Sequence, residues 1–309
     1  MIPLPHKSTD CIRLADWMEL CALVAPDGDV SRDDLDSALR TAAVFPPRDE
    51  DKEIDDLVLA VFRELESRRA AAADGYSFEL SLPTLKRKDN WPDFPTYVFC
   101  LCLSYFGERS SKNQKSAPRR LFEHVSRDAA IHYLGGDAVR FGWPRHNPEI
   151  PSKFAKAMTF LCTTSLAEGG GYKQGGLPYP KDSGIDIIAW KHFPDRAVGK
   201  LLLFGNCATE KDWDGPKKTE LSPEAFCEEW MTEVPPSRIA IVKSLFIPHR
   251  CESTALASHT RRAGIIFDRC RIAYCCYAGC NGNKDAKQKF TDWATVSAWS
   301  RDQIQKFGP

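Results

Sequence analysis

The sequence lacks three features that would place the chain in a special class. Its longest strongly apolar run, "YVFCLCLSYF" from Tyr97, is too short for a membrane helix, which needs roughly 20 residues. Its first residues, "MIPLPHKSTDC", show no apolar core of a signal peptide. Nor is there an excess of one charge, since 42 basic residues balance 42 acidic ones. We therefore expect a cytoplasmic protein without membrane association, in which only local charge patterns can indicate a nucleic-acid partner.

Cysteine, by contrast, is abundant, with 12 in 309 residues. In an intracellular protein such cysteines are expected to be reduced and buried. The length is sufficient for two domains, or for one large domain with an appendage.

The first 135 residues or so predict helices. "CIRLADWMELCALVA", "DKEIDDLVLAVFRELESRRAAAA" and "RRLFEHVSRDAAIHYL" repeat apolar residues every three or four positions, which is typical of helices packed on a core. Ser31 precedes another such segment and is expected to cap it. A basic loop, "RSSKNQKSAPRR" at 109–120, lies between two of these segments and is a candidate for contacts with phosphate groups.

The pattern changes near residue 150. A helix over "PSKFAKAMTFLCTTSLAEGGGY" is followed by strand-like runs in "GIDIIAW", "GKLLLFGNCA", "SRIAIVKSLFI" and "GIIFDRCRIAYCCYA", with one helix, "SPEAFCEEWMTE", among them. The segment "TDWATVSAWSRDQIQKF" predicts a closing helix. We therefore predict a mixed α+β fold. A helical N-terminal domain at 1–145 has a regulatory or binding role, and an α/β domain with a central mixed sheet covers 146–309.

Polar residues interrupt two of the expected strands. Alternation places Asp186 on the same face as Ile188 and Trp190, where a lone carboxylate is costly unless a cation pairs with it. Asn206 ends the next strand, and the loop at 191–199 has the length to join the two strands as a hairpin, with Asp186 beside Asn206. Glu168 extends the inward face of the preceding helix, so it is expected to approach the same place.

This order of a helix glutamate, a strand aspartate and a polar residue on the next strand resembles the PD-(D/E)XK nuclease superfamily, most of all its Mrr-type restriction endonucleases. The matching stretches are "LAEGGGY", "DSGIDIIAW" and "LLLFGNCAT", within roughly residues 150–250. The resemblance implies a restriction-endonuclease-like domain that hydrolyses DNA in a bacterial restriction or anti-phage defence system, with a partner defence protein as a further expected partner. It also implies Mg²⁺ or Mn²⁺ held by Glu168, Asp186 and Asn206.

Two positions depart from that pattern. Asn206 stands where the family has an acid or a glutamine, and Ala208 occupies the position of its lysine. Lys211 is the first candidate to replace that lysine, with Lys200 and Lys191 as alternatives. A catalytically inactive protein of the same fold, binding nucleic acid or a partner protein, is therefore the main alternative. The candidate contacts to nucleic acid are Lys112, Lys115, Arg119, Arg120 and Lys200.

Two other chemistries are compatible with the cysteines. Cys207 at a strand end, with His192 or His249 as base, is the pattern of a cysteine hydrolase. A zinc site is the second possibility, although the spacing lacks a CxxC pair. Its ligands would come from Cys270, Cys275, Cys276 and Cys280, with Cys251 and His249 upstream.

Overall fold

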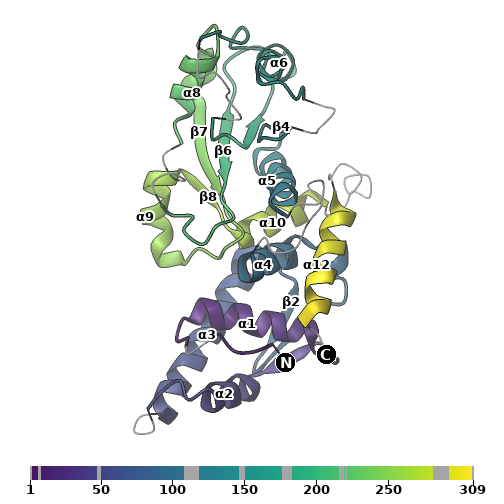
Figure 1. Cartoon of the computed structure of the whole chain (residues 1–309), viewed down its shortest axis with the longest axis vertical. Helices are drawn as coiled ribbons and strands as arrows, with labels where there is room; N and C mark the ends of the chain where they lie inside the picture. Colours follow the sequence, from purple (N-terminus) through teal and green to yellow (C-terminus); the bar gives the residue numbers. More distant parts are fainter. Residues whose placement is uncertain are drawn as a thin grey trace.

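The chain folds into a mixed α/β structure with two open sheets (Figure 1). The structure is a computed structural model, and it describes residues 2–5, 8–46, 50–107, 118–145, 150–175, 183–215, 219, 221–280 and 292–307.

The N-terminal part combines four helices with a small sheet. The helices are α1 (Cys11–Val24), α2 (Arg32–Thr41), α3 (Glu50–Ala72) and α4 (Thr96–Phe106), with short 3-10 turns η1 (Ala73–Gly75) and η2 (Trp91–Asp93). Ser31 caps α2 as expected, because its hydroxyl accepts from the backbone N–H of Asp34. The sheet was not predicted. It consists of β1 (Asp29–Ser31), β2 (Phe78–Ser81) and β3 (Thr84–Arg87), antiparallel in the order β1-β3-β2.

The larger sheet has five strands in the order β4-β5-β6-β7-β8. They are β4 (Asp137–Arg140), β5 (Ile187–Trp190), β6 (Leu202–Cys207), β7 (Ile241–Phe246) and β8 (Ile265–Phe267). β4, β5 and β6 run antiparallel, whereas β7 and β8 continue parallel to β6. The mixed sheet and the hairpin of β5 with β6 are thus as predicted.

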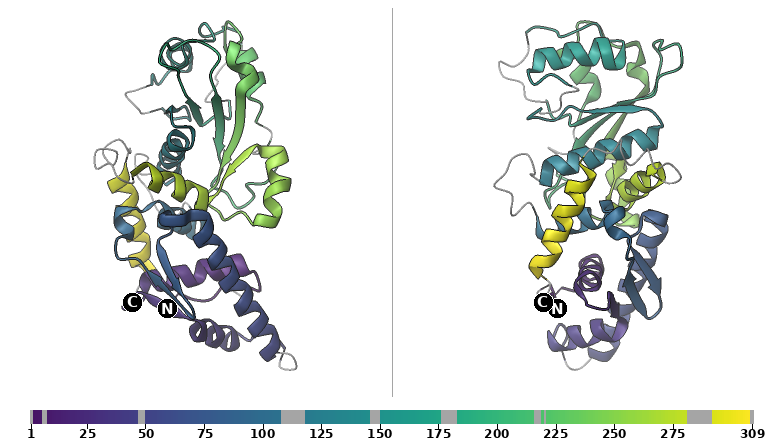
Figure 2. Two further views of the ribbon diagram at one scale, coloured as in Figure 1. Left: turned by 180° about the vertical axis from the view of Figure 1, so that it is seen from behind. Right: turned by 90° about the vertical axis from the view of Figure 1, so that its right-hand side faces the viewer.

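The remaining helices surround this sheet and join it to the N-terminal part. They are α5 (Pro118–Leu134), α6 (Phe154–Phe160) with a π turn η4 (Leu161–Leu166), α8 (Pro223–Trp230), η5 (Pro236–Ala240), α9 (Ser253–Ala263), α10 (Arg269–Cys280) and α12 (Trp293–Phe307). The closing helix is as expected, and it packs on α4 and α1 (Figure 2). The run from Ile265 is a correction: only its first three residues form a strand, and the rest is α10.

Alternation along β5 places its side chains in two different cores, as the sequence predicts. Ile187 and Ala189 belong to a large core that continues through α5 and α10 into the N-terminal helices. Ile188 and Trp190 face the opposite side, where α6, η4 and α8 cover the sheet.

The two parts of the chain are closely connected. The boundary expected after residue 145 falls inside the larger sheet, because β4 precedes it and yet pairs with β5, Arg140 opposite Ile187. Helices α5 and α10 lie between this sheet and the N-terminal helices (Figure 1). The structure therefore groups α5 and β4 with the strands that follow them.

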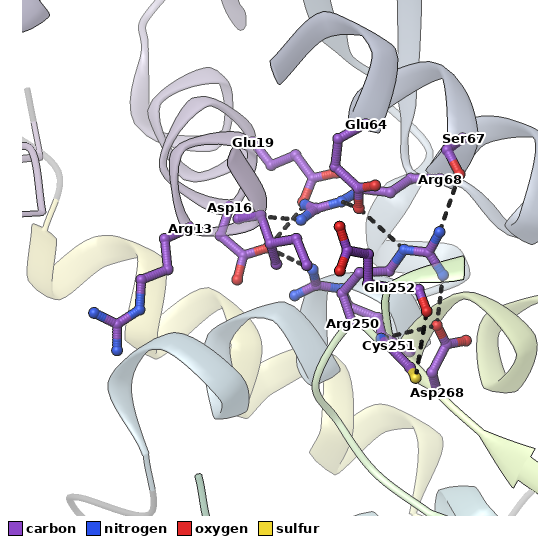
Figure 3. Close-up of polar contacts among 12 residues, drawn as sticks. Arg13, Asp16, Glu19, Glu64, Ser67, Arg68, Arg250, Cys251, Glu252 and Asp268 are labelled. Atoms are coloured by element: carbon purple, nitrogen blue, oxygen red, sulfur yellow. Dashed lines mark hydrogen bonds and ion pairs between the residues drawn. The ribbon is translucent and has the colours of Figure 1, made fainter. Parts of the chain in front are cut away.

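A network of buried charged groups forms where α1 and α3 meet the C-terminal part (Figure 3). Arg68 is fully buried, and its Nη1 donates to Asp16 Oδ1 and to Glu19 Oε2, each at 2.8 Å. Its Nε donates to Glu64 Oε1, also at 2.8 Å. Burial alone would raise the pKa of Asp16, but Arg269 and Arg68 hold that pKa below its usual value.

Two arginines of the C-terminal part complete this network. Arg250 donates from Nε to Glu64 Oε1 at 3.0 Å and from Nη1 to Asp268 Oδ2 at 2.7 Å. Arg269 donates to Asp16 Oδ1 at 2.5 Å. Residues far apart in the sequence therefore share one set of ion pairs.

Candidate acidic site at the end of strands β5 and β6

Glu168, the expected helix ligand, does not approach Asp186. After α6 the chain widens into the π turn η4 and then reverses at Ala167, whose φ of 55° is left-handed. Glu168 is thereby turned into a different buried position. Its Oε1 accepts from Lys200 Nζ at 2.6 Å and from the Ser237 hydroxyl at 2.9 Å.

This ion pair lies at the wrong end of the sheet for the predicted metal site. Lys200 lies two residues before the start of β6, whereas Asp186 contacts Cys207, the last residue of β6. The prediction that Glu168 and Asp186 share a cation is therefore wrong. Lys200 is also 1% exposed. Its ammonium group therefore pairs with Glu168 and is not available to a nucleic-acid phosphate.

Asp186 stands at the start of β5, where the predicted hairpin begins. The register pairs Ile187 with Gly205, and the backbone N–H of Asp186 also donates to the Gly205 carbonyl, at 2.9 Å, so the pairing becomes irregular at Asp186. Asp186 is 4% exposed, and its Oδ2 accepts from the backbone N–H of Cys207 at 2.8 Å. On its other side, the Asp186 carbonyl accepts from both Phe141 and Gly142, so two residues after β4 lie opposite one residue, which is a β-bulge in that neighbouring strand.

The strand pairing is thus irregular on both sides of Asp186, and its side chain departs from the predicted alternation. It does not share the face of Ile188 and Trp190, as alternation predicted, but turns towards α5. Its partner there is Glu123, a residue that sequence reasoning missed. A Cβ placed at Gly142 would lie 2.9 Å from Asp186 Oδ1 and 3.0 Å from Glu123 Oε2. Two buried carboxylates therefore converge on a point that only glycine leaves open.

Arginines compensate part of this negative charge. Arg140 is buried, and its Nη1 donates to Glu123 Oε2 at 2.5 Å and to the carbonyl of Gly142 at 3.0 Å. Arg119 is 45% exposed at the start of α5, with its guanidinium 3.8 Å from Glu123 Oε1 and 3.9 Å from Glu210 Oε1. Arg119 was expected to contact nucleic acid, and the structure places it at the open side of this acidic site.

The other expected cations lie elsewhere. Ala208, in the position of the family's lysine, is buried in an apolar cluster with Leu245 and Ile247. Lys211 is exposed and lines a separate cavity beside α1. Arg120 is half-buried on α5, whereas Lys112 and Lys115 lie outside the described residues.

Asn206 is the third expected ligand, and it stays at the edge of the site. It is half-buried, one residue before the end of β6. Along β6, Leu203 and Cys207 face α5, whereas Leu202 and Phe204 face the other side, and by alternation Asn206 follows Phe204. Within the part of the chain that the structure describes, no three His, Cys, Asp or Glu side chains cluster as a metal site.

Cys207 is in the site but is not poised as a nucleophile. Burial raises the pKa of its thiol well above the usual value, and Asp186 and Glu123 raise it further, whereas an attacking cysteine needs a lowered pKa. The proposed bases are engaged with backbone carbonyls, His192 with Ser165 and His249 with Thr209. The geometry gives no support to a cysteine hydrolase.

The cysteines considered as zinc ligands are core residues of α10. Cys270, Cys275 and Cys276 belong to the large apolar core, and burial raises the pKa of each thiol. A zinc ligand must be a thiolate, so this environment does not favour zinc.

No family model matches the chain, and searches of curated proteins and of solved structures find no significant match. In the described residues there is no helix long and apolar enough to cross a membrane.

Proposed function

We propose that the chain is a metal-dependent nuclease that hydrolyses phosphodiester bonds of DNA, with Glu123 and Asp186 as its metal-holding carboxylates. The observation that supports this is the convergence of the two carboxylates on Gly142. The proposal keeps the order of the family pattern, a helix glutamate and then a strand aspartate. The helix glutamate now comes from α5 and not from the helix expected before Glu168.

The donor set suits a hard divalent cation. Carboxylate oxygens are the ligands that Mg²⁺ prefers, and Mg²⁺ is commonly held by one or two carboxylates while retaining several waters. Two carboxylates at Gly142 meet that requirement. When bound, the ion would stabilise charge on the phosphate and make a bound water more acidic.

The surrounding residues orient these groups. The Cys207 amide fixes Asp186 Oδ2, so that Oδ1 faces Gly142. Arg140 fixes Glu123 by donating to Oε2, the same oxygen that faces Gly142. Arg119, on the open side, is the residue placed to neutralise a phosphate of the bound strand.

Cleavage of supercoiled plasmid in Mg²⁺ or Mn²⁺ tests the proposal. Asp186→Asn and Glu123→Gln should each abolish cutting, whereas Glu229→Gln, an exposed glutamate on α8, should cut normally. Titration of Mn²⁺ followed by electron paramagnetic resonance should show one site that both active-site variants lose. Cutting that persists in both variants would exclude this pair as the catalytic centre.

A second function, binding of nucleic acid or a partner protein without cleavage, is favoured by two observations. Ala208 supplies no lysine, and Arg140 already compensates the charge of Glu123. An intact plasmid under both metals, together with retained DNA binding that depends on Arg119, would support it. Either function is compatible with the role in bacterial restriction or anti-phage defence that the resemblance implies.

A further inference from the structure

A second cavity lies between α1 and the segment that follows β6. Its volume is about 450 Å³, which is within the usual range for small-molecule sites. Four separate stretches of the chain line it. Arg13 comes from the first turn of α1 and Tyr105 from the end of α4. Lys211 and Trp213 follow β6, and His249 follows β7.

One wall of this cavity is fixed by internal bonds. His249 Nδ1 lies 3.0 Å from the Ser104 hydroxyl and its Nε2 lies 3.2 Å from the Thr209 carbonyl. Burial lowers the pKa of His249, so the ring is neutral at pH 7. Arg250 and Asp16, which also line the cavity, are engaged in the buried charge network. These groups shape the site and have little charge to offer a ligand.

Two cationic side chains on the lining are available to bind a ligand. Arg13 and Lys211 are both exposed, and within the described ranges neither charged group makes an ion pair or a hydrogen bond to the protein. Figure 3 shows the Arg13 side chain extending away from the network around Asp16 and Arg68. Asp10, the other acid on the lining, accepts with Oδ1 from the amides of Ile12 and Arg13 as the cap of α1. The open part of the cavity therefore favours an anion.

The lining also offers aromatic surface. Tyr105 and Trp213 both contribute to it and both are half-buried. Aromatic side chains provide stacking surfaces for nucleobases, whatever the base, and cations beside them bind phosphate. Phosphate and an aromatic ring in one molecule describe a nucleotide.

We propose that this cavity binds a nucleoside phosphate, with Arg13 and Lys211 on the phosphate and Tyr105 and Trp213 against the base. Lys211 is thereby a ligand-binding residue and not a displaced catalytic lysine. The inference does not depend on the proposed nuclease activity. Binding can be measured with EDTA present, so failure of one proposal is distinguishable from failure of the other.

Isothermal titration with AMP, GMP, CMP and UMP tests this site, with adenosine and inorganic phosphate as partial probes. At least one nucleotide should bind at least about tenfold more tightly than either partial probe. Arg13→Ala and Lys211→Ala should each weaken that binding about tenfold or more, while melting temperatures stay unchanged because both side chains are exposed. Arg301→Ala and Lys156→Ala, exposed cations of α12 and α6, are the matched controls.

Three results would overturn the proposal. The first is no binding of any of the four nucleotides. The second is that none of the four nucleotides binds more tightly than inorganic phosphate, which would leave the aromatic lining without a role. The third is nucleotide binding that neither Arg13→Ala nor Lys211→Ala weakens relative to the controls.

Discussion

The ammonium group of Lys200 lies 2.6 Å from Oε1 of Glu168, and both side chains are buried. Removal of one partner leaves an uncompensated buried charge, which typically costs about 3–5 kcal/mol. We expect Lys200→Met to lower the free energy of unfolding by that order, measured by urea denaturation. The double variant Lys200→Met/Glu168→Leu should recover part of the loss, because no lone charge remains. A single variant as stable as the wild type would contradict a structural role for this pair.

Gly142 provides a steric test of the acidic site. Its replacement by alanine places a methyl group 2.9 Å from Asp186 Oδ1 and 3.0 Å from Glu123 Oε2, so the two carboxylates must separate. We expect Gly142→Ala to weaken Mn²⁺ binding at least about tenfold, as displaced ligands usually do, and to reduce plasmid cutting accordingly. Gly171→Ala is the matched control, since nothing lies within 4 Å of its added Cβ.

The buried network predicts a contrast between two arginines. Arg68 is fully buried among three carboxylates, so Arg68→Met should destabilise the protein by about 3–5 kcal/mol. Arg32 pairs with Asp55 on the surface, where the side chains are 49% and 66% exposed, and Arg32→Met should cost no more than about 1 kcal/mol. Chemical denaturation of both variants at one ionic strength checks this. Equal losses would show that the network is not the stabilising element we describe.

His124 predicts a loss of stability in acid. Burial, together with nearby Arg140, Arg127 and Arg120, lowers its pKa from 6.5 to about 3. The unfolded chain therefore binds a proton at this residue below pH 6.5 and the folded protein does not, so stability falls as pH decreases from 6.5 towards 3. At pH 5 this one residue should cost about 2 kcal/mol. His124→Gln should show a shallower decline between pH 7 and pH 5, measured by urea denaturation at each pH.

Cys207 offers a test between reaction classes. Because its thiol is buried and its pKa is raised, it should react slowly with thiol reagents in the folded protein. Cys207→Ala should retain plasmid cutting, since the Cys207 contact to Asp186 comes from the backbone amide. Complete loss of activity in a folded Cys207→Ala protein would reopen the cysteine hydrolase.

Local signals predicted much of the fold. The alternation in "GIDIIAW" and "KLLLFGNC" gave the β5–β6 hairpin, and Ser31 marked the start of α2. The segment from Ile265 was misread because α10 is apolar on nearly all sides, and such a helix shows no period. Asp268 was the available signal: it accepts from the backbone N–H of Arg271, as the cap of a helix does.

The candidate site was harder to predict, because its geometry depends on backbone irregularities. A π turn and a left-handed Ala167 redirect Glu168, and nothing in "FLCTTSLAEGG" indicates either. Irregular strand pairing on both sides of Asp186 accompanies the turn of its side chain towards α5. No sequence signal singled out Glu123, because its helix shows only the apolar pattern of core packing. Tertiary structure alone brings it near Asp186.

The arginine–carboxylate network between α1, α3 and the segment around Arg250 has a consequence for how the chain can vary. Glu64 and Asp16, which both bind Arg68, have further partners 186 and 253 residues along the chain, Arg250 and Arg269. A fragment ending near residue 145 would expose these charges to water and lose Arg250 and Arg269. Neither part can therefore be exchanged for that of a divergent protein unless the matching charges are exchanged with it, and a chimera that ignores them should be recovered as insoluble protein.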